Sequence, residues 1–243
     1  MVPSRVRTCC TDLAARRAQA GDRSSRGCAP GAISAPMWET CYQMRYDGLS
    51  GGRMVLSDVD IKRYLELGKI KIAPDLPPEQ FGSCSVDFRL GSEFNVFEYS
   101  RHAFIDPRDR DSLQHIMRTV EVPPGEPFVL QPRDFVLAVT LESLELDAET
   151  LGRLEGRSSL GRIGIIVHGT AGLFDPGWTG KATLELSNLS RMAVALYPGM
   201  RICSFTFEQL STPSSMPYRQ KPGNKYAGQL HPLASRLGSE VSK

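Results

Sequence analysis

The sequence predicts an all-β fold, a barrel or jelly roll with little helix. Several short runs alternate polar and apolar residues, which is the period of a half-buried strand; residues 85–90 and 181–186 are the clearest. Turns rich in glycine and proline separate such runs, at residues 123–125, 175–177 and 198–199. Many short strands between turns of this kind are typical of barrels and jelly rolls.

The first expected element is a short helix that begins after Ser57. Ser57 is a good N-cap, and Asp60 follows three residues later, close to a capping box. Apolar residues recur at helical spacing from Ile61, and Gly68 is placed to end the helix. Further strands are expected after it, at residues 135–142, 164–168, 193–197 and 202–207.

Residues 1–53 differ from the rest of the chain in composition. They hold eight arginines and four acidic residues, a charge of +4, and four of the six cysteines. They show neither strand nor helix periodicity, so we interpret them as a disordered extension or as an over-long gene start, with translation beginning at Met54. The alternatives are a transit peptide and a metal site built from those four cysteines.

Residues 54–243 form one expected domain, which ends in a tail rich in serine, proline and glycine from Ser211. The domain is left with 21 basic and 23 acidic residues, which gives no electrostatic reason to bind nucleic acid. No run of 18 apolar residues occurs, so no membrane-spanning helix is expected. Its two cysteines, Cys84 and Cys203, suit a reducing compartment such as the cytoplasm.

The densest polar run of the β region covers residues 155–162. It holds Arg157, Ser158, Ser159 and Arg162 together with two glycines. Glycine lets a backbone approach phosphate, serine offers a hydroxyl and an N–H group, and arginine supplies a planar fork for phosphate oxygens. A short helical turn beginning at Ser158 would add free N–H groups. The run lacks the spacing of a P-loop, and a solvated turn is the alternative.

Two acidic residues are candidates for contact with a substrate. Asp175 lies in a tight loop, where it could bind a sugar hydroxyl, polarise a water or merely close an Asp-Pro-Gly turn. Glu185 shares a strand face with Lys181 and Thr183, where it is either solvated or, on the wall of a cleft, a general acid or base. The residues alone leave both alternatives open.

Three motifs together resemble the dCTP deaminases, which are relatives of the trimeric dUTPases. Residues 155–162, 168–180 and 183–185 occur in the order and spacing of that family. The resemblance extends from Met54 to about Arg236 and includes the strand at residues 85–90.

The resemblance implies a distorted β-barrel of the dUTPase type that assembles as a homotrimer with active sites between subunits. Glu185 would be the general base that activates a water for attack on C4 of cytosine, after which ammonia leaves. Ser158 and Arg162 would lie beside that water and come from a neighbouring subunit. The tail, about residues 211–243, would be a mobile lid over the nucleotide.

The resemblance also implies a set of residues that bind dCTP or dUTP. Asp175 would contact the deoxyribose, and Thr183 and Leu184 would offer backbone groups to the base. The full set is Arg157, Ser158, Ser159, Leu160, Gly161, Arg162, Asp175, Thr183, Leu184, Glu185, Ser204, Tyr218, Lys225 and Gln229.

Ala171 and Gly172 resemble the small pair of family members that continue from dCTP to dUMP and pyrophosphate, so this two-step reaction is expected. Glycine there would leave space for a second water near the α-phosphate. Ser204 and Trp178 depart from that branch, which commonly has glutamine and phenylalanine. The alternatives are a deaminase that releases dUTP, a dUTPase, and a non-catalytic nucleotide-binding homologue. Mg²⁺ is expected only with the triphosphate, no zinc is expected, and dTTP is expected to inhibit.

Overall fold

The computed structural model describes residues 54–98, 104–108 and 115–237. The hypotheses for residues 1–53 therefore lie outside the described residues. Within the described part, the elements are mostly strands, and this confirms the predicted all-β class.

The predicted helix is present as α3 (Asp58–Glu66). The Ser57 side chain accepts a hydrogen bond from the Asp60 backbone N–H, as an N-cap does, and Gly68 follows the helix in the left-handed conformation (φ 69°). Ile61 is fully buried and anchors the helix to the sheet. No helix among the described residues is long and apolar enough to cross a membrane.

Twelve strands and three short helical turns are the other regular elements of the described residues. The strands are β1 (Met54–Val55), β2 (Ile70–Ala73), β3 (Val86–Phe97), β4 (Met117–Glu121), β5 (Phe128–Leu130), β6 (Phe135–Leu146), β7 (Thr150–Gly156), β8 (Ile165–Ile166), β9 (Leu173–Phe174), β10 (Thr179–Asn188), β11 (Val194–Leu196) and β12 (Arg201–Gln209). The turns are η1 (Pro78–Gln80), α5 (Ser158–Gly161) and η2 (Tyr218–Gln220).

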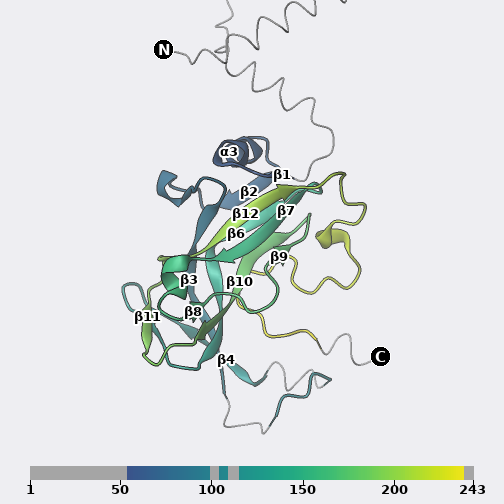
Figure 1. Cartoon of the computed structure of the whole chain (residues 1–243). Coiled ribbons are helices and arrows are strands. Elements are labelled where there is room, and N and C mark those ends of the chain that lie inside the picture. Colours follow the sequence, from purple (N-terminus) through teal and green to yellow (C-terminus); the bar gives the residue numbers. More distant parts are fainter. Residues whose placement is uncertain (1–53, 99–103, 109–114, 238–243) are drawn as a thin grey trace, which may run out of the picture. The chain divides into compact units, whose positions relative to one another are not determined.

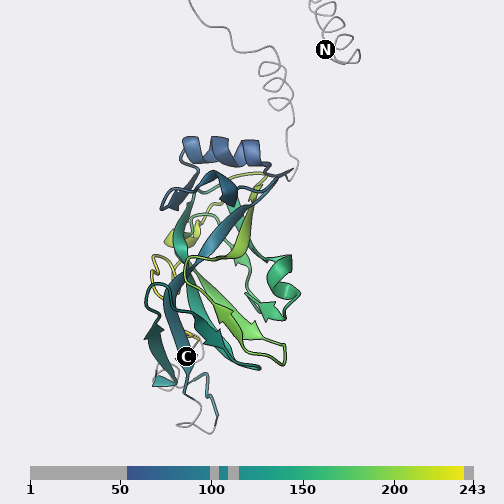
Figure 2. The same ribbon diagram turned by 90° about the vertical axis from the view of Figure 1, so that its left-hand side faces the viewer.

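Ten of these strands form one antiparallel sheet whose main path runs β8-β10-β6-β3-β12-β7-β9. The sheet curls, and α3 lies across one end of it, while β4, β8 and β11 lie toward the other end (Figure 1, Figure 2). The path ends at β8 and β9. These two strands do not pair with each other in the described residues, so the sheet is a curled half-barrel rather than a closed barrel. Strands β5 and β11 pair separately.

The predicted strands and turns are found, with some boundaries shifted. The run 164–168 contracts to the two residues of β8, and the glycines of the three predicted turns, Gly125, Gly177 and Gly199, all adopt positive φ. Strand β7 escaped prediction because it buries Thr150 and Gly152, which carry no apolar signal. Strands β2, β4, β5 and β9 are too short or too polar to show a period.

One face of the sheet, across β10, β6, β3 and β4, positions the candidate site. The strand registers place Glu185 opposite Leu137, Leu137 opposite Asn95, and Asn95 opposite Thr119, so these side chains share a face. The neighbouring residues along the strands, such as Leu184, point the other way into the core. The tail crosses the site face, where the Asn95 side chain donates a hydrogen bond to the backbone oxygen of Pro232.

Candidate active site

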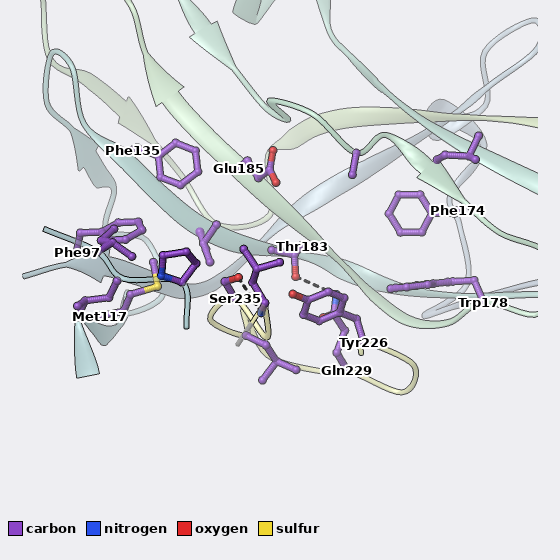
Figure 3. Close-up of a pocket in the computed structure, with 18 of the residues that line it drawn as sticks. Phe97, Met117, Phe135, Phe174, Trp178, Thr183, Glu185, Tyr226, Gln229 and Ser235 are labelled. Atoms are coloured by element: carbon purple, nitrogen blue, oxygen red, sulfur yellow. Dashed lines mark hydrogen bonds between the residues drawn. The ribbon is translucent and has the colours of Figure 1, made fainter. Parts of the chain in front are cut away.

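A cavity of about 570 Å³ opens on this face of the sheet. Its lining comes from β3, β4, β6, β9 and β10, from the loops before β4, β9 and β10, and from the tail. Thr183 and Glu185 lie on one side, and Phe97, Met117 and Phe135 form an apolar side next to the glutamate (Figure 3). The cavity therefore joins a small polar end to a larger apolar one, as ligand sites commonly do.

Glu185 is half-buried in the middle of β10, and one of its oxygens is held by backbone donors. The N–H groups of Gly169 and Thr170 donate to Oε2 at 2.7 and 3.2 Å. A Cβ atom on Gly169 would lie 3.1 Å from that oxygen, so glycine allows the backbone to come this close. The other oxygen, Oε1, accepts no hydrogen bond from the described residues. The carboxylate is thus fixed in orientation and keeps one oxygen for a water or ligand.

Asp175 begins the predicted Asp-Pro-Gly turn, and its backbone does close that turn. The Trp178 N–H donates to the Asp175 backbone oxygen at 3.0 Å, and Gly177 has φ 81°. The side chain is not used in the turn: it lines the cavity and accepts no hydrogen bond from the described part of the chain. Asp175 therefore closes the turn through its backbone and still has its carboxylate available for a ligand or a water.

The tail closes the polar end of the cavity through Gln229. Its Nε2 donates to the Lys181 backbone oxygen at 2.9 Å and to Thr183 Oγ1 at 2.8 Å, as Figure 3 shows for the second contact. Its backbone oxygen accepts from the Lys181 N–H at 2.8 Å. The Gln229 Oε1 atom is buried and has no hydrogen-bond partner in the described residues. This acceptor is left for a donor on a ligand.

Two tyrosines fold the tail back on its own chain. Tyr218 packs its ring against Trp178, with centroids 5.3 Å apart, and its hydroxyl oxygen accepts from the Tyr226 backbone N–H at 3.3 Å. The Tyr226 hydroxyl oxygen accepts in turn from the Arg236 N–H at 3.1 Å. The tail thus packs over the cavity, and whether it moves as a lid stays a prediction.

The structure brings together only part of the predicted set. Ala171, Asp175, Thr183, Glu185, Tyr218 and Gln229 line the cavity. Its other described lining residues include no arginine, lysine or histidine, so Asp175 and Glu185 are the charged side chains that face it. The predicted residues that do not line it are Arg157, Ser158, Ser159, Leu160, Gly161, Arg162, Gly172, Leu184, Ser204 and Lys225.

The polar run 155–162 forms a separate, mostly exposed loop. The predicted helical turn is present as α5, and Leu160 is buried in the core, where it anchors the loop. Arg157 lies 3.2 Å from Asp87 of its own chain, and the Ser204 hydroxyl also donates to Asp87. These two predicted substrate contacts are therefore engaged within the chain.

Two further predicted residues have packing roles in the structure. Leu184 is fully buried, so any contact it makes with a base would come from its backbone. A Cβ atom on Gly172 would lie 2.9 Å from the Leu154 backbone oxygen and 3.2 Å from the His168 ring. The space above Gly172 is thus filled by protein, which is a different reason for glycine than room for a water. Its part in the second reaction step stays a prediction.

Sequence reasoning missed the apolar side of the cavity. Phe97, Met117, Phe135 and Leu137 line it from three strands that are distant in sequence. The alternation within β6 could have placed Phe135 and Leu137 on one face, but only the register with β10 sets that face beside Glu185.

Metal-ligating side chains do not gather in the described part of the chain: no group of three or more histidine, cysteine, aspartate or glutamate side chains there could hold an ion. The expected lack of zinc stays a prediction.

Comparison with known proteins places this geometry in a family. The family model for dCTP deaminase-like proteins matches residues 55–210. The chain is 61% identical to a dCTP deaminase of Thermomicrobium roseum over 190 residues, which cover 78% of this chain and 96% of that protein. It is 52% identical to a dUMP-forming dCTP deaminase of Dictyoglomus thermophilum over 191 residues, 78% of this chain and 98% of the relative.

A solved structure is also similar. The crystal structure of the 2′-deoxycytidine 5′-triphosphate deaminase of Agrobacterium tumefaciens superposes with a TM-score of 0.52 at 26% identity. The match covers 65% of this chain and 48% of that one, so the chain spans about half the length of that protein.

Proposed function

The chain belongs to the dCTP deaminase-like family, and from this premise we propose that it converts dCTP and two waters to dUMP, pyrophosphate and ammonia. The observation that carries the proposal is the Glu185 carboxylate at the wall of the cavity: two backbone N–H groups hold Oε2, and Oε1 accepts no hydrogen bond from the described residues. That is the arrangement a general base needs.

In the deamination step, Glu185 takes a proton from a water while the water oxygen bonds to C4 of cytosine. The glutamate passes this proton to the ring nitrogen N3, then takes the second proton from the new C4 hydroxyl and gives it to the amino group. The C4–N bond breaks as the C4 carbonyl forms, and ammonia leaves. A fixed carboxylate lowers the cost of aligning the water with C4. The product of this step is dUTP.

Backbone groups along one edge of β10 are suited to hydrogen bonding with the pyrimidine base. The N–H groups of Lys181 and Glu185 donate to Gln229 and Val167, respectively, on the same side of the strand. Thr183 lies between them, and strand alternation directs its backbone groups into the gap. We infer that these groups and the unpartnered Gln229 Oε1 bind the base. Asp175 is placed to bind the deoxyribose hydroxyl.

The triphosphate needs positive charge that the described lining residues do not supply, because the two charged side chains among them, Asp175 and Glu185, are acidic. We infer that a second copy supplies Arg157, Ser158 and Arg162 in a homotrimer with shared active sites, and that Lys225 adds a charge from the tail. Apolar side chains are exposed near α5 and β8, and this supports the inference that a second copy covers the surface there. These side chains are Ile163, Ile166, Leu189 and Met192.

Magnesium is assigned here to the substrate, as a complex of Mg²⁺ with the triphosphate, because the described side chains offer no ligand group of their own. Inhibition by dTTP stays a prediction. A cytoplasmic location is supported by Cys84 and Cys203, which are both free thiols.

Release of dUTP is the second candidate. The relative at 61% identity is named a dCTP deaminase, and the dUMP-forming relative is less similar at 52%. Product analysis decides between the two: the chain is incubated with dCTP and Mg²⁺, and nucleotides are separated by chromatography. We expect ammonia, dUMP and pyrophosphate. Accumulated dUTP would restrict the activity to deamination, and no ammonia would refute the function.

Complementation tests the shared site. Glu185→Gln and Arg162→Ala should each be nearly inactive alone. Co-expression of the two should restore part of the activity, because some interfaces then combine an intact Glu185 with an intact Arg162. A mixture with no activity beyond that of its parts would mean that each site lies within one chain.

A further inference from the structure

A network of charged side chains lies where β3, β12 and the end of β7 meet, outside the cavity. Asp87 on β3 stands directly opposite Ser204 on β12, and the Ser204 hydroxyl donates to Asp87 Oδ1. The other oxygen, Oδ2, lies 3.2 Å from Arg157 Nη2 and 3.2 Å from Arg201 Nη1. Both oxygens of this carboxylate are therefore engaged.

Arg157 is held from two directions. Besides the ion pair with Asp87, its Nη1 donates to the Arg201 backbone oxygen at 3.0 Å. The side chains of Arg157 and Asp87 are only 26% and 16% exposed, so water competes weakly for these contacts. The remaining N–H groups of the Arg157 guanidinium have no hydrogen-bond partner among the described residues and can donate to a ligand.

Two guanidinium groups, those of Arg157 and Arg201, share the carboxylate of Asp87, and this fixes the Arg157 side chain in place. A side chain that is already ordered loses less conformational freedom when it binds phosphate.

From this geometry we propose that Asp87 is a positioning residue: together with Ser204 it fixes the Arg157 guanidinium for triphosphate binding without touching the nucleotide itself. The inference rests on the proposed function, in which Arg157 binds the triphosphate. It also gives Ser204 a role through Asp87 rather than through direct contact with the substrate.

The first test is Asp87→Asn, which removes the negative charge and keeps the shape. The KM for dCTP should rise about tenfold, with kcat changed by less than about twofold, because a charged hydrogen bond to a binding group is lost. The inhibition constant of inorganic tripolyphosphate should rise by the same factor. An unchanged KM would overturn the proposal.

A double-mutant cycle separates positioning from general structural damage. If Asp87 acts through Arg157, Asp87→Asn should have no further effect on KM in an Arg157→Ala background. An equal effect in both backgrounds would overturn the proposal. Glu208→Gln is the matched control, since it breaks the Arg153–Glu208 pair (2.7 Å) across β7 and β12, and it should leave KM unchanged.

Calorimetric titration with tripolyphosphate distinguishes a failure of this inference from a failure of the proposed function. If the wild-type chain releases no ammonia from dCTP, the function is wrong, yet tripolyphosphate binding still reports on Asp87 and Arg157. If Asp87→Asn does not fold, Ser204→Ala replaces it in the titration. Weaker binding is then expected, and unchanged binding would overturn the proposal.

Discussion

The carboxylates at the cavity and the buried carboxylate of the Arg89–Glu142 pair are bonded in opposite ways. At the cavity, the Asp175 carboxylate and the Oε1 atom of Glu185 accept no hydrogen bond from the described residues, while Glu185 Oε2 is held by two backbone N–H groups. Glu142, which is fully buried near Asp87, has both oxygens engaged: Arg89 Nε donates at 2.6 Å to Oε1, and the Arg89 backbone N–H donates at 2.7 Å to Oε2. The same chemical group is thus left open at the cavity wall and is fully paired inside the fold.

Replacing the Glu185 carboxylate should give the largest loss of activity and almost no loss of stability. We expect Glu185→Gln to lower kcat for ammonia release by about a thousandfold, because the amide cannot take a proton from water. Urea unfolding should change by less than about 0.5 kcal/mol, since the amide oxygen can still accept from Gly169. Steady-state kinetics and denaturation measure the two effects.

Glu66→Gln is the control for this change, as Glu66 is exposed on α3 and away from the cavity. It should leave both kcat and stability near their wild-type values. Substantial activity in Glu185→Gln would contradict the assignment of the base.

Breaking the paired carboxylate should affect stability instead. Arg89→Ala leaves the Glu142 carboxylate buried without its cation, at a cost of about 3 kcal/mol in the free energy of unfolding. Lys62→Ala removes an exposed pair with Asp58 on α3 and should cost less than about 0.5 kcal/mol. Equal losses in urea unfolding would mean that burial does not distinguish the two pairs.

The contact between the tail and β10 can be broken from the glycine side. Gly180 has φ 124°, and a Cβ atom there would lie 2.6 Å from the Gln229 backbone oxygen. Gly180→Ala should therefore cost about 2 kcal/mol and raise the KM for dCTP, because it displaces Gln229. Limited proteolysis of the tail and steady-state kinetics are the measurements.

Gly199→Ala is the matched control for backbone strain. Gly199 also has positive φ (86°), but nothing lies within 4 Å of its added Cβ atom. It should cost about 1 kcal/mol and leave KM unchanged. A raised KM in both variants would show that strain, rather than the loss of Gln229, is responsible.

The smallest expected effect is a loss of stability at alkaline pH. Burial, reinforced by Glu142 and then Asp87, raises the pKa of the Cys203 thiol well above its ordinary 9.0. The native thiol keeps its proton while the unfolded thiol loses it, so stability falls as pH rises above that ordinary value. By about pH 10 the loss from this group is about 1.4 kcal/mol.

Urea unfolding at about pH 8 and pH 10 measures this loss. Cys203→Ala should lose less stability than the wild type between these two pH values. Cys84→Ser, which alters an exposed thiol, should behave as the wild type does. Identical pH dependence in all three proteins would contradict the assignment.

Local signals accounted for much of the fold. The Ser57 cap and Gly68 bounded the helix, and period-two alternation marked β3, β6, β10 and β12. Strands such as β7 carried no such signal, because glycine and threonine occupy buried positions. Alternation also cannot distinguish a solvated face from the wall of a cavity, so it leaves the role of Glu185 open.

The sequence by itself determined the fold class, the helix, the turns and, through its family motifs, the residues worth testing. Only the tertiary structure decided that Asp175, Thr183, Glu185 and Gln229 share one cavity while Arg157 pairs with Asp87 elsewhere. The reason is physical: local preferences depend on neighbours a few residues away, whereas strand register and tail packing join groups separated by tens of residues. Which charged side chains line a cavity, and which do not, therefore follows only from the tertiary structure.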